Sequence, residues 1–429
     1  MKKYLVILFI FMIPVLSLSQ EITLEYIAHN AIDLNAIENG NENFMGFDQI
    51  DVLLEGVEIV MLGEQTHLDG ATFETKIKLI KYLHQKLGFD LLLFESSMYE
   101  CEKAWEDISN GGDIRVNMGK AINTFWSPLH EFKPLTDYVS ESLNSEHPLE
   151  VKGFDNQLGG AIAEEKLIAE LKVYLSKTNP SLIDEEVLEV LQDKLLEELW
   201  YLNFKKLKKK DAKKIMTYCQ GIVSELDKIQ NNDEAEYWSR HLNGLISFIS
   251  DLKFGTEFRD EEMAKNLIWI KASHPGKKII CWGATSHFLY NSSKVKPLKK
   301  NKAIEKHYQQ TRMMGDYLKE KYQDKVYTIG FTTYEGEYGT TGYGAIEKIE
   351  KPNRNSLEFL LGQAKYHNYL LPFEEYLSTS LPSRPLGYQY IKSDLTAMMD
   401  AIIFNRTMKK ANLDKALFIK LYPDHKYIK

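Results

Sequence analysis

Apolar and polar positions along the chain follow two patterns, the short buried strand and the amphipathic helix. Residues 57–62 form an apolar, β-branched run that predicts a buried strand, and residues 91–94 form another. Between these runs, apolar residues recur at helical spacing from Phe73 to Leu87, and Gly88 follows as a helix C-terminus requires. The order strand, helix, strand predicts a βαβ unit, so the two strands should run parallel with a right-handed crossover.

The same alternation continues along the chain. Further apolar runs predict strands at residues 149–154, 277–282, 326–332 and 398–405. Helical spacing predicts helices at residues 98–108, 126–139, 259–270 and 312–321. The glycine-rich stretch 336–344 predicts a loop. Together these elements predict an α/β fold with a parallel-rich central sheet flanked by helices.

Residues 161–254 differ from the rest because they carry helical patterning and no strand pattern. We interpret them as an all-helical insertion over the active edge of the sheet. The lysine-rich run at residues 204–214 is expected to be a solvated end of a helical hairpin, since the whole protein is acidic. The predicted organisation is a signal peptide (1–19), a first part of the core (20–160), the helical insertion (161–255) and a second part of the core (256–429).

The N-terminus has the composition of a secretory signal peptide. Lys2 and Lys3 precede an apolar run at residues 4–16, and small residues lead to a predicted cleavage point after Ser19. No other apolar run is long enough to span a membrane. The sequence therefore predicts an exported protein, periplasmic or secreted, without a stable membrane anchor after cleavage. The net charge of -8 gives no electrostatic footprint for nucleic acid.

Three cysteines occur far apart in the sequence. An odd number without paired spacing argues against both a disulfide framework and a cysteine-rich zinc site. Cys101, Cys219 and Cys281 are therefore expected to be small buried hydrophobic residues.

Ionisable residues follow the predicted strands at the point where each strand ends. They are Glu64 with His67, then Glu95, Asp155 and His287. The carboxyl ends of parallel strands meet at one edge, where open α/β sheets bind ligands. One acid after a strand is often a helix cap, and one histidine is more often structural. Convergence from four strands instead predicts a functional site.

The sequence lacks the motifs of several other chemistries. We find no G-x-S-x-G elbow, no P-loop and no G-x-G-x-x-G after a strand, so no covalent nucleophile is indicated. Two histidines and several carboxylates instead suit the deprotonation of a water molecule. Without a cofactor motif we predict none, although the same side chains would also suit zinc or manganese, and this alternative stays open.

Six phrases, in this order and spacing, resemble the erythromycin esterase family. They are GEQTH (63–67), LGFDLLLFES (87–96), GFDNQ (153–157), RDEEMAKNL (259–267), WGATSH (282–287) and MGDYL (314–318). The resemblance implies an α/β core with a helical insertion over a deep cleft. It also implies hydrolysis of a small-molecule ester or lactone, a macrolactone in the best-known members, without a covalent acyl-enzyme.

The resemblance also implies roles for individual residues. His67 would be the base that activates water, Glu64 and Glu95 would orient it, and His287 would lie near the ester carbonyl. The residues expected to line or brace the substrate cleft are Lys76, Asp155, Arg259 and Asp260.

The sequence departs from the family pattern at three points. Ala284 and Thr285 stand where many relatives carry His and Asn, and Leu68 stands where Gly is common. Lys76 replaces the Arg of resistance esterases, which keeps the charge but loses the bidentate fork. These departures put macrolides in question as substrates. Two alternatives therefore remain, a metal-dependent hydrolase on the same residues and a non-catalytic envelope binding protein.

Overall fold

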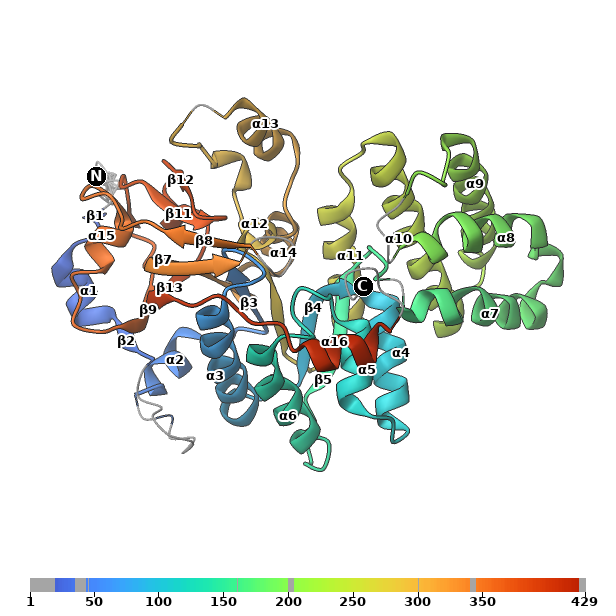
Figure 1. Ribbon diagram of the computed structural model, residues 1–429, viewed down its shortest axis with the longest axis horizontal. Coiled ribbons are helices and arrows are strands. Elements are labelled where there is room, and N and C mark those ends of the chain that lie inside the picture. Colours follow the sequence, from blue (N-terminus) through green and yellow to red (C-terminus); the bar gives the residue numbers. More distant parts are fainter. Residues whose placement is uncertain are drawn as a thin grey trace, which may run out of the picture.

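The computed structural model describes residues 20–34, 44, 46–159, 161–199, 204–299, 301–339 and 345–423; the predicted signal peptide lies outside these ranges. Among the described residues, a nine-stranded sheet crosses the molecule in the order β2-β9-β13-β7-β3-β6-β4-β5, with β8 paired to β7 (Figure 1). Its strands are β2 (Ile32–Asp33), β3 (Ile59–Glu64), β4 (Leu91–Ser97), β5 (Glu150–Asp155), β6 (Ile279–Ala284), β7 (Val326–Gly339), β8 (Ile346–Ile349), β9 (Asn368–Pro372) and β13 (Ala401–Met408). Two small sheets pair β1 (Gln20–Glu21) with β10 (Leu377–Ser378) and β11 (Ser383–Leu386) with β12 (Gln389–Ile391).

The sheet is mostly parallel. The strands from β13 to β5 pair in parallel, while β9 runs antiparallel to β13 and β2 antiparallel to β9. Strand β3 lies inside the sheet, and every residue from Ile59 to Glu64 is buried. This burial on both faces explains the unbroken apolar run in its sequence. The predicted α/β fold with a parallel-rich sheet is confirmed.

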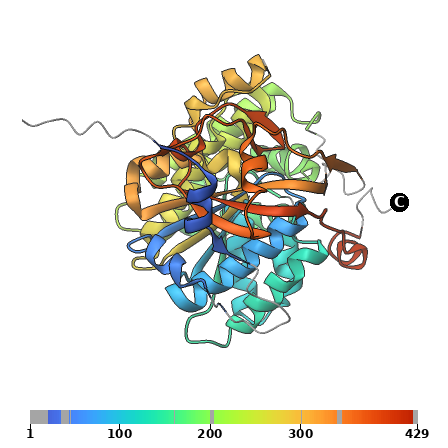
Figure 2. The ribbon, with the colours of Figure 1, turned by 90° about the vertical axis from the view of Figure 1, so that its left-hand side faces the viewer.

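Helices cover both faces of the sheet (Figures 1 and 2). Alternate residues of β3 point to opposite sides. Val60 and Leu62 pack with the face of α3, whereas Ile59 and Met61 pack with residues of α11 and α14. The helices outside residues 161–254 are α1 (Leu24–Asn30), α2 (Asp48–Leu53), α3 (Gly70–Leu87), α4 (Met98–Ser109), α5 (Ile114–Ala121), α6 (Lys133–Ser142), α11 (Arg259–Ser273), α12 (Thr285–Phe288), α13 (Lys302–Gln310), α14 (Met314–Tyr322), α15 (Leu357–Leu361) and α16 (Lys415–Leu421).

The segment from residue 161 to 254 folds into helices throughout its described part. It contains α7 (Ala161–Thr178), α8 (Glu185–Lys194), α9 (Lys209–Leu226) and α10 (Asp233–Phe254), which lie together on the right of Figure 1. Helix α10 contacts the loop that follows β5 through a hydrogen bond, in which Asn156 Nδ2 donates to Ser247 Oγ at 3.1 Å. The helical segment therefore touches the carboxyl edge of the sheet.

Two sequence predictions were wrong in part. Residues 336–339 belong to β7 rather than to a loop, because β8 pairs with this end of the strand and satisfies its backbone; residues 340–344 lie outside the described ranges. The helix predicted at residues 126–139 begins at Lys133, with a proline in its first turn. Residues 126–132 form a turn and a short 3-10 helix instead.

Candidate active site

The carboxyl ends of four neighbouring strands carry the candidate residues. Strand β3 ends at Glu64, which pairs in register with Ala284 at the end of β6. Strand β4 carries Glu95 near its end, and β5 ends at Asp155. Because β3, β6, β4 and β5 are adjacent in the sheet, these side chains converge as the sequence predicted.

Glu64 and His67 form the first histidine–carboxylate pair. Glu64 Oε1 lies 2.9 Å from His67 Nδ1 and accepts a hydrogen bond from Trp126 Nε1 at 2.7 Å. Glu64 Oε2 accepts a hydrogen bond from Lys76 Nζ at 2.7 Å. A carboxylate partner requires the proton on Nδ1, so neutral His67 carries its free lone pair on Nε2. Among the described residues, no hydrogen bond reaches this nitrogen.

Lys76 lies inside the protein, beneath Glu64. Its side chain has no exposed surface, and its Nζ lies 3.3 Å from the Gly283 carbonyl and 4.6 Å from the centre of the Trp282 ring. Burial lowers the pKa of Lys76, against the pull of Glu64. Lys76 therefore bonds Glu64 from inside the protein and offers no surface to a substrate, although the sequence placed it among the substrate-binding residues.

Two aromatic rings surround His67. Its imidazole stacks on Phe125, with 5.4 Å between the ring centres and an interplanar angle of 11°. The Trp126 ring meets it edge-on, with 5.2 Å between the ring centres and an angle of 87°.

About one third of the His67 side chain remains exposed. Burial disfavours its charged form, but the hydrogen bond to Glu64 and the charge of Glu95 raise the pKa of His67 above its usual value.

Asp260 and His287 form a second histidine–carboxylate pair. Asp260 Oδ1 lies 2.8 Å from His287 Nδ1 and accepts a hydrogen bond from the Met314 N–H at 2.9 Å. His287 Nε2 lies 3.3 Å from Arg259 Nη1 and 3.4 Å from Glu95 Oε1. Burial lowers the pKa of His287, but the charges of Asp260 and Glu95 outweigh it, so the net shift is upward.

Arg259 ties the second pair to the sheet edge. Its guanidinium donates from Nε and Nη2 to the two oxygens of Asp155, at 3.2 and 2.6 Å, and from Nη2 to Glu95 Oε1 at 2.8 Å. Glu95 Oε2 accepts a hydrogen bond from the Ala284 N–H at 2.9 Å. Burial alone would raise the pKa of Glu95, yet the charges of His287 and Arg259 lower it to about 2.

All eight predicted site residues meet in one cluster, with a different grouping from the expected one. Glu95 hydrogen-bonds Arg259 and the backbone of Ala284, so it is built into the second pair rather than the first. Asp155 and Asp260 are almost fully buried and already paired. Among the four residues assigned to substrate, Arg259 has the most exposed side chain, at about a quarter.

Sequence reasoning missed Phe125 and Trp126. Trp126 was expected to begin a helix, Phe125 directly precedes it, and neither side chain is titratable. The indole N–H of Trp126 nevertheless completes the hydrogen-bonding of Glu64. A buried tryptophan needs a partner for this N–H, which is the one signal that could have pointed to it.

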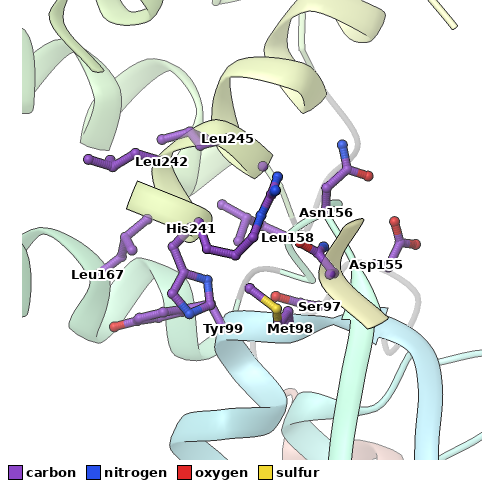
Figure 3. A pocket seen from close by; sticks show the side chains of 13 residues that line it. Ser97, Met98, Tyr99, Asp155, Asn156, Leu158, Leu167, His241, Leu242 and Leu245 are labelled. Atoms are coloured by element: carbon purple, nitrogen blue, oxygen red, sulfur yellow. The ribbon is translucent and has the colours of Figure 1, made fainter. Parts of the chain in front are cut away.

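A small cavity lies beside Asp155, between α10 and the ends of β4 and β5 (Figure 3). The amide oxygens of Asn156 and Asn266 are buried in this region without hydrogen-bond partners among the described residues. Its enclosed volume is about 20 Å³, which is room for one water molecule. The cavity is therefore too small for a substrate.

Further observations bear on the sequence predictions. Within the described residues, no cluster of three or more His, Cys, Asp or Glu side chains has the arrangement of a metal site. All three cysteines are free and buried, as predicted. No helix in the described part of the chain is both long and apolar enough to cross a bilayer.

The model of the erythromycin esterase family matches residues 84–408. The chain belongs to this family. The matched range contains Glu95, Asp155 and the second histidine–carboxylate pair, whereas Glu64 and His67 precede it. A protein of Bacillus subtilis (strain 168), YbfO, provisionally named a hydrolase, is 27% identical over 371 residues, which cover 79% of this chain and 78% of the relative. Family and relative together support a hydrolase.

Solved structures share the fold of this erythromycin esterase family member. A Bacillus cereus protein matches with a TM-score of 0.73 at 18% identity, over 91% of this chain and 98% of that one. A protein described as a succinoglycan biosynthesis protein matches with a TM-score of 0.70 at 19% identity, over 91% and 97%. A mutant of the erythromycin esterase EreC in its open conformation matches with a TM-score of 0.64 at 16% identity, over 87% and 96%.

Proposed function

We propose that this protein hydrolyses a small-molecule ester or lactone with water activated by His67. The observation that carries the proposal is the arrangement of His67, whose Nδ1 is fixed by Glu64 while Nε2 is without a partner among the described residues and the side chain is partly exposed. This is the arrangement of a general base. Membership of the erythromycin esterase family supports an ester as the substrate class.

In the proposed reaction, His67 Nε2 takes a proton from water as the water oxygen attacks the carbonyl carbon. The π electron pair of the carbonyl moves to its oxygen and gives a tetrahedral intermediate. The intermediate collapses, the bond to the alcohol oxygen breaks, and the leaving oxygen takes the proton from His67. One ester and one water give one carboxylic acid and one alcohol, without a covalent enzyme intermediate.

The surrounding residues have supporting roles in this proposal. Glu64 holds the tautomer of His67 and stabilises the imidazolium that forms. Lys76 is a positioning residue for Glu64 rather than a substrate ligand, since it has no exposed surface. Arg259 brings positive charge to the carboxyl edge of the sheet, where it favours the oxyanion of the intermediate, and His287 lies against this guanidinium.

The proposed substrate and location rest on the family and on the N-terminal residues. Macrolides are candidates because the chain belongs to the erythromycin esterase family. Lys76 makes one hydrogen bond to Glu64 where an arginine would make a fork, so the site differs from the resistance esterases at this point. The composition of residues 1–19 supports export.

The test is a hydrolysis screen by mass spectrometry with macrolides, simple lactones and simple esters. Wild type should produce the acid and alcohol of at least one compound, and His67→Ala should not, although it keeps the wild-type melting temperature. His130→Ala is the matched control, because His130 is exposed and lies outside the cluster. Equal turnover by His67→Ala and wild type would refute the proposal.

A further inference from the structure

We propose that Phe125 and Trp126 are positioning residues that hold the imidazole of His67 and the carboxylate of Glu64 in one reactive arrangement. This inference rests on the proposed role of His67 as the base. We call the two rings the aromatic clamp. It consists of two consecutive residues, so one short loop fixes both partners of the histidine–carboxylate pair.

Trp126 acts on the carboxylate. Its Nε1 donates to Glu64 Oε1 at 2.7 Å, and this is the same oxygen that lies 2.9 Å from His67 Nδ1. Lys76 occupies the other oxygen, so the carboxylate cannot rotate without breaking a buried hydrogen bond. Two donors on one oxygen share its electron density, and Trp126 therefore limits how strongly Glu64 stabilises charged His67.

Phe125 acts on the imidazole. The two rings lie nearly parallel, with 5.4 Å between their centres, while the Trp126 ring stands perpendicular to His67. One ring thus covers a face of the imidazole and the other meets it edge-on. Rotation of the imidazole about its Cβ–Cγ bond would lose the stack and the hydrogen bond to Glu64 together. The aromatic face also favours the imidazolium that forms during the reaction.

The loop that carries the clamp is tied to the same edge of the sheet as the site. The Asn123 N–H donates to Ser96 Oγ at 2.9 Å, and Ser96 follows Glu95 in β4. The Trp126 N–H donates to the Asn123 carbonyl at 2.9 Å. Movement of this loop would therefore shift both rings relative to His67.

The test is an NMR titration of the histidine rings, which needs no substrate. Trp126→Phe keeps an aromatic ring, although a smaller one, and removes the N–H, so the pKa of His67 should rise by about half a unit to one unit. Phe125→Leu should lower the pKa of His67, since the aromatic face is lost. Trp269→Phe is the matched control, because Trp269 is a half-buried tryptophan of α11 outside the cluster, and it should leave His67 unchanged.

The proposal is overturned if the pKa of His67 in both Trp126→Phe and Phe125→Leu equals that of the wild type. It is also overturned if Phe125→Leu, on an ester found in the screen, keeps the wild-type kcat; we expect kcat to fall about 10-fold with little change in KM. Phe125 is half-buried, so Phe125→Leu keeps the test decisive if Trp126→Phe does not fold. If no ester is hydrolysed but the titration shifts as expected, the clamp stands and the proposed function fails.

Discussion

The two histidine–carboxylate pairs of the site look alike and differ in what surrounds the second ring nitrogen. In both pairs a buried acid fixes Nδ1, Glu64 for His67 and Asp260 for His287. Nε2 of His287 lies against Arg259 and Glu95, and only about one sixth of that side chain is exposed. His67 is twice as exposed, and no hydrogen bond from the described residues reaches its Nε2.

In the proposed mechanism, this difference gives the two histidines different roles. A base must offer a lone pair to a water molecule, which His67 can do and His287 cannot do without breaking its contact with Arg259. His287 is held within a network of opposite charges, where it contributes electrostatics and fixed geometry. The acid on Nδ1 makes a histidine well oriented, and the freedom of Nε2 makes it reactive.

The largest expected effect is on the base itself. His67→Asn should lower kcat on a hydrolysed ester by about 1,000-fold or more, since the positioned base is lost. His287→Asn should cost about 10-fold to 100-fold, because only an electrostatic contribution is lost. Steady-state kinetics on one ester checks both values, and the reverse order would exchange the two roles.

The next effect concerns the network of the second pair. Arg259→Met leaves the carboxylates of Glu95 and Asp155 buried without their cation, which should lower the free energy of unfolding by about 3–5 kcal/mol. Arg312→Met is the control, because Arg312 forms an exposed pair with Glu320 and should cost about 0–1 kcal/mol. Urea unfolding measures both, and equal values would show that the network adds no stability.

A smaller effect is expected from substitution of Lys76, which bonds Glu64 of the first pair from inside the protein. Lys76→Met removes the buried cation from Glu64, so the carboxylate can shift and His67 loses its orientation. We expect kcat to fall about 10-fold to 100-fold with little change in KM. Lys78→Met on the same helix, where the side chain is partly exposed, should leave kcat unchanged. A large rise in KM for Lys76→Met would instead restore the substrate-binding role first expected for this lysine.

The smallest expected effect is that of chelation. Within the described residues each histidine is bonded to its own acid, and no three or more His, Cys, Asp or Glu side chains gather as a metal site would need. Prolonged dialysis against a chelator should leave the rate of hydrolysis within about twofold. Loss of activity that zinc or manganese restores would favour the metal-dependent alternative.

The site could be predicted from sequence because strand ends are simple to locate. Apolar runs located the ends of β3, β4, β5 and β6 to within three residues. Because the carboxyl ends of parallel strands meet at one edge, Glu64, Glu95 and His287 were then expected to lie together. The grouping into two pairs could not be predicted, since it depends on side-chain directions across loops. Trp126 was missed because its residue spacing predicted a helix, whereas it lies in a turn. Its contribution to the site is a single N–H that donates to Glu64. The antiparallel β9 and the β7–β8 pairing depend on partners distant in sequence.

The most direct test of the account is the pH dependence of kcat/KM for hydrolysis. His67 must be neutral to accept a proton from water, and its pKa is raised above the usual value of about 6.5. Activity should therefore fall with decreasing pH, with an apparent pKa above 6.5, because protonation removes the base. This acidic limb should persist in His287→Asn and vanish from the residual activity of His67→Asn. An unchanged limb in His67→Asn, or its loss in His287→Asn alone, would contradict the account.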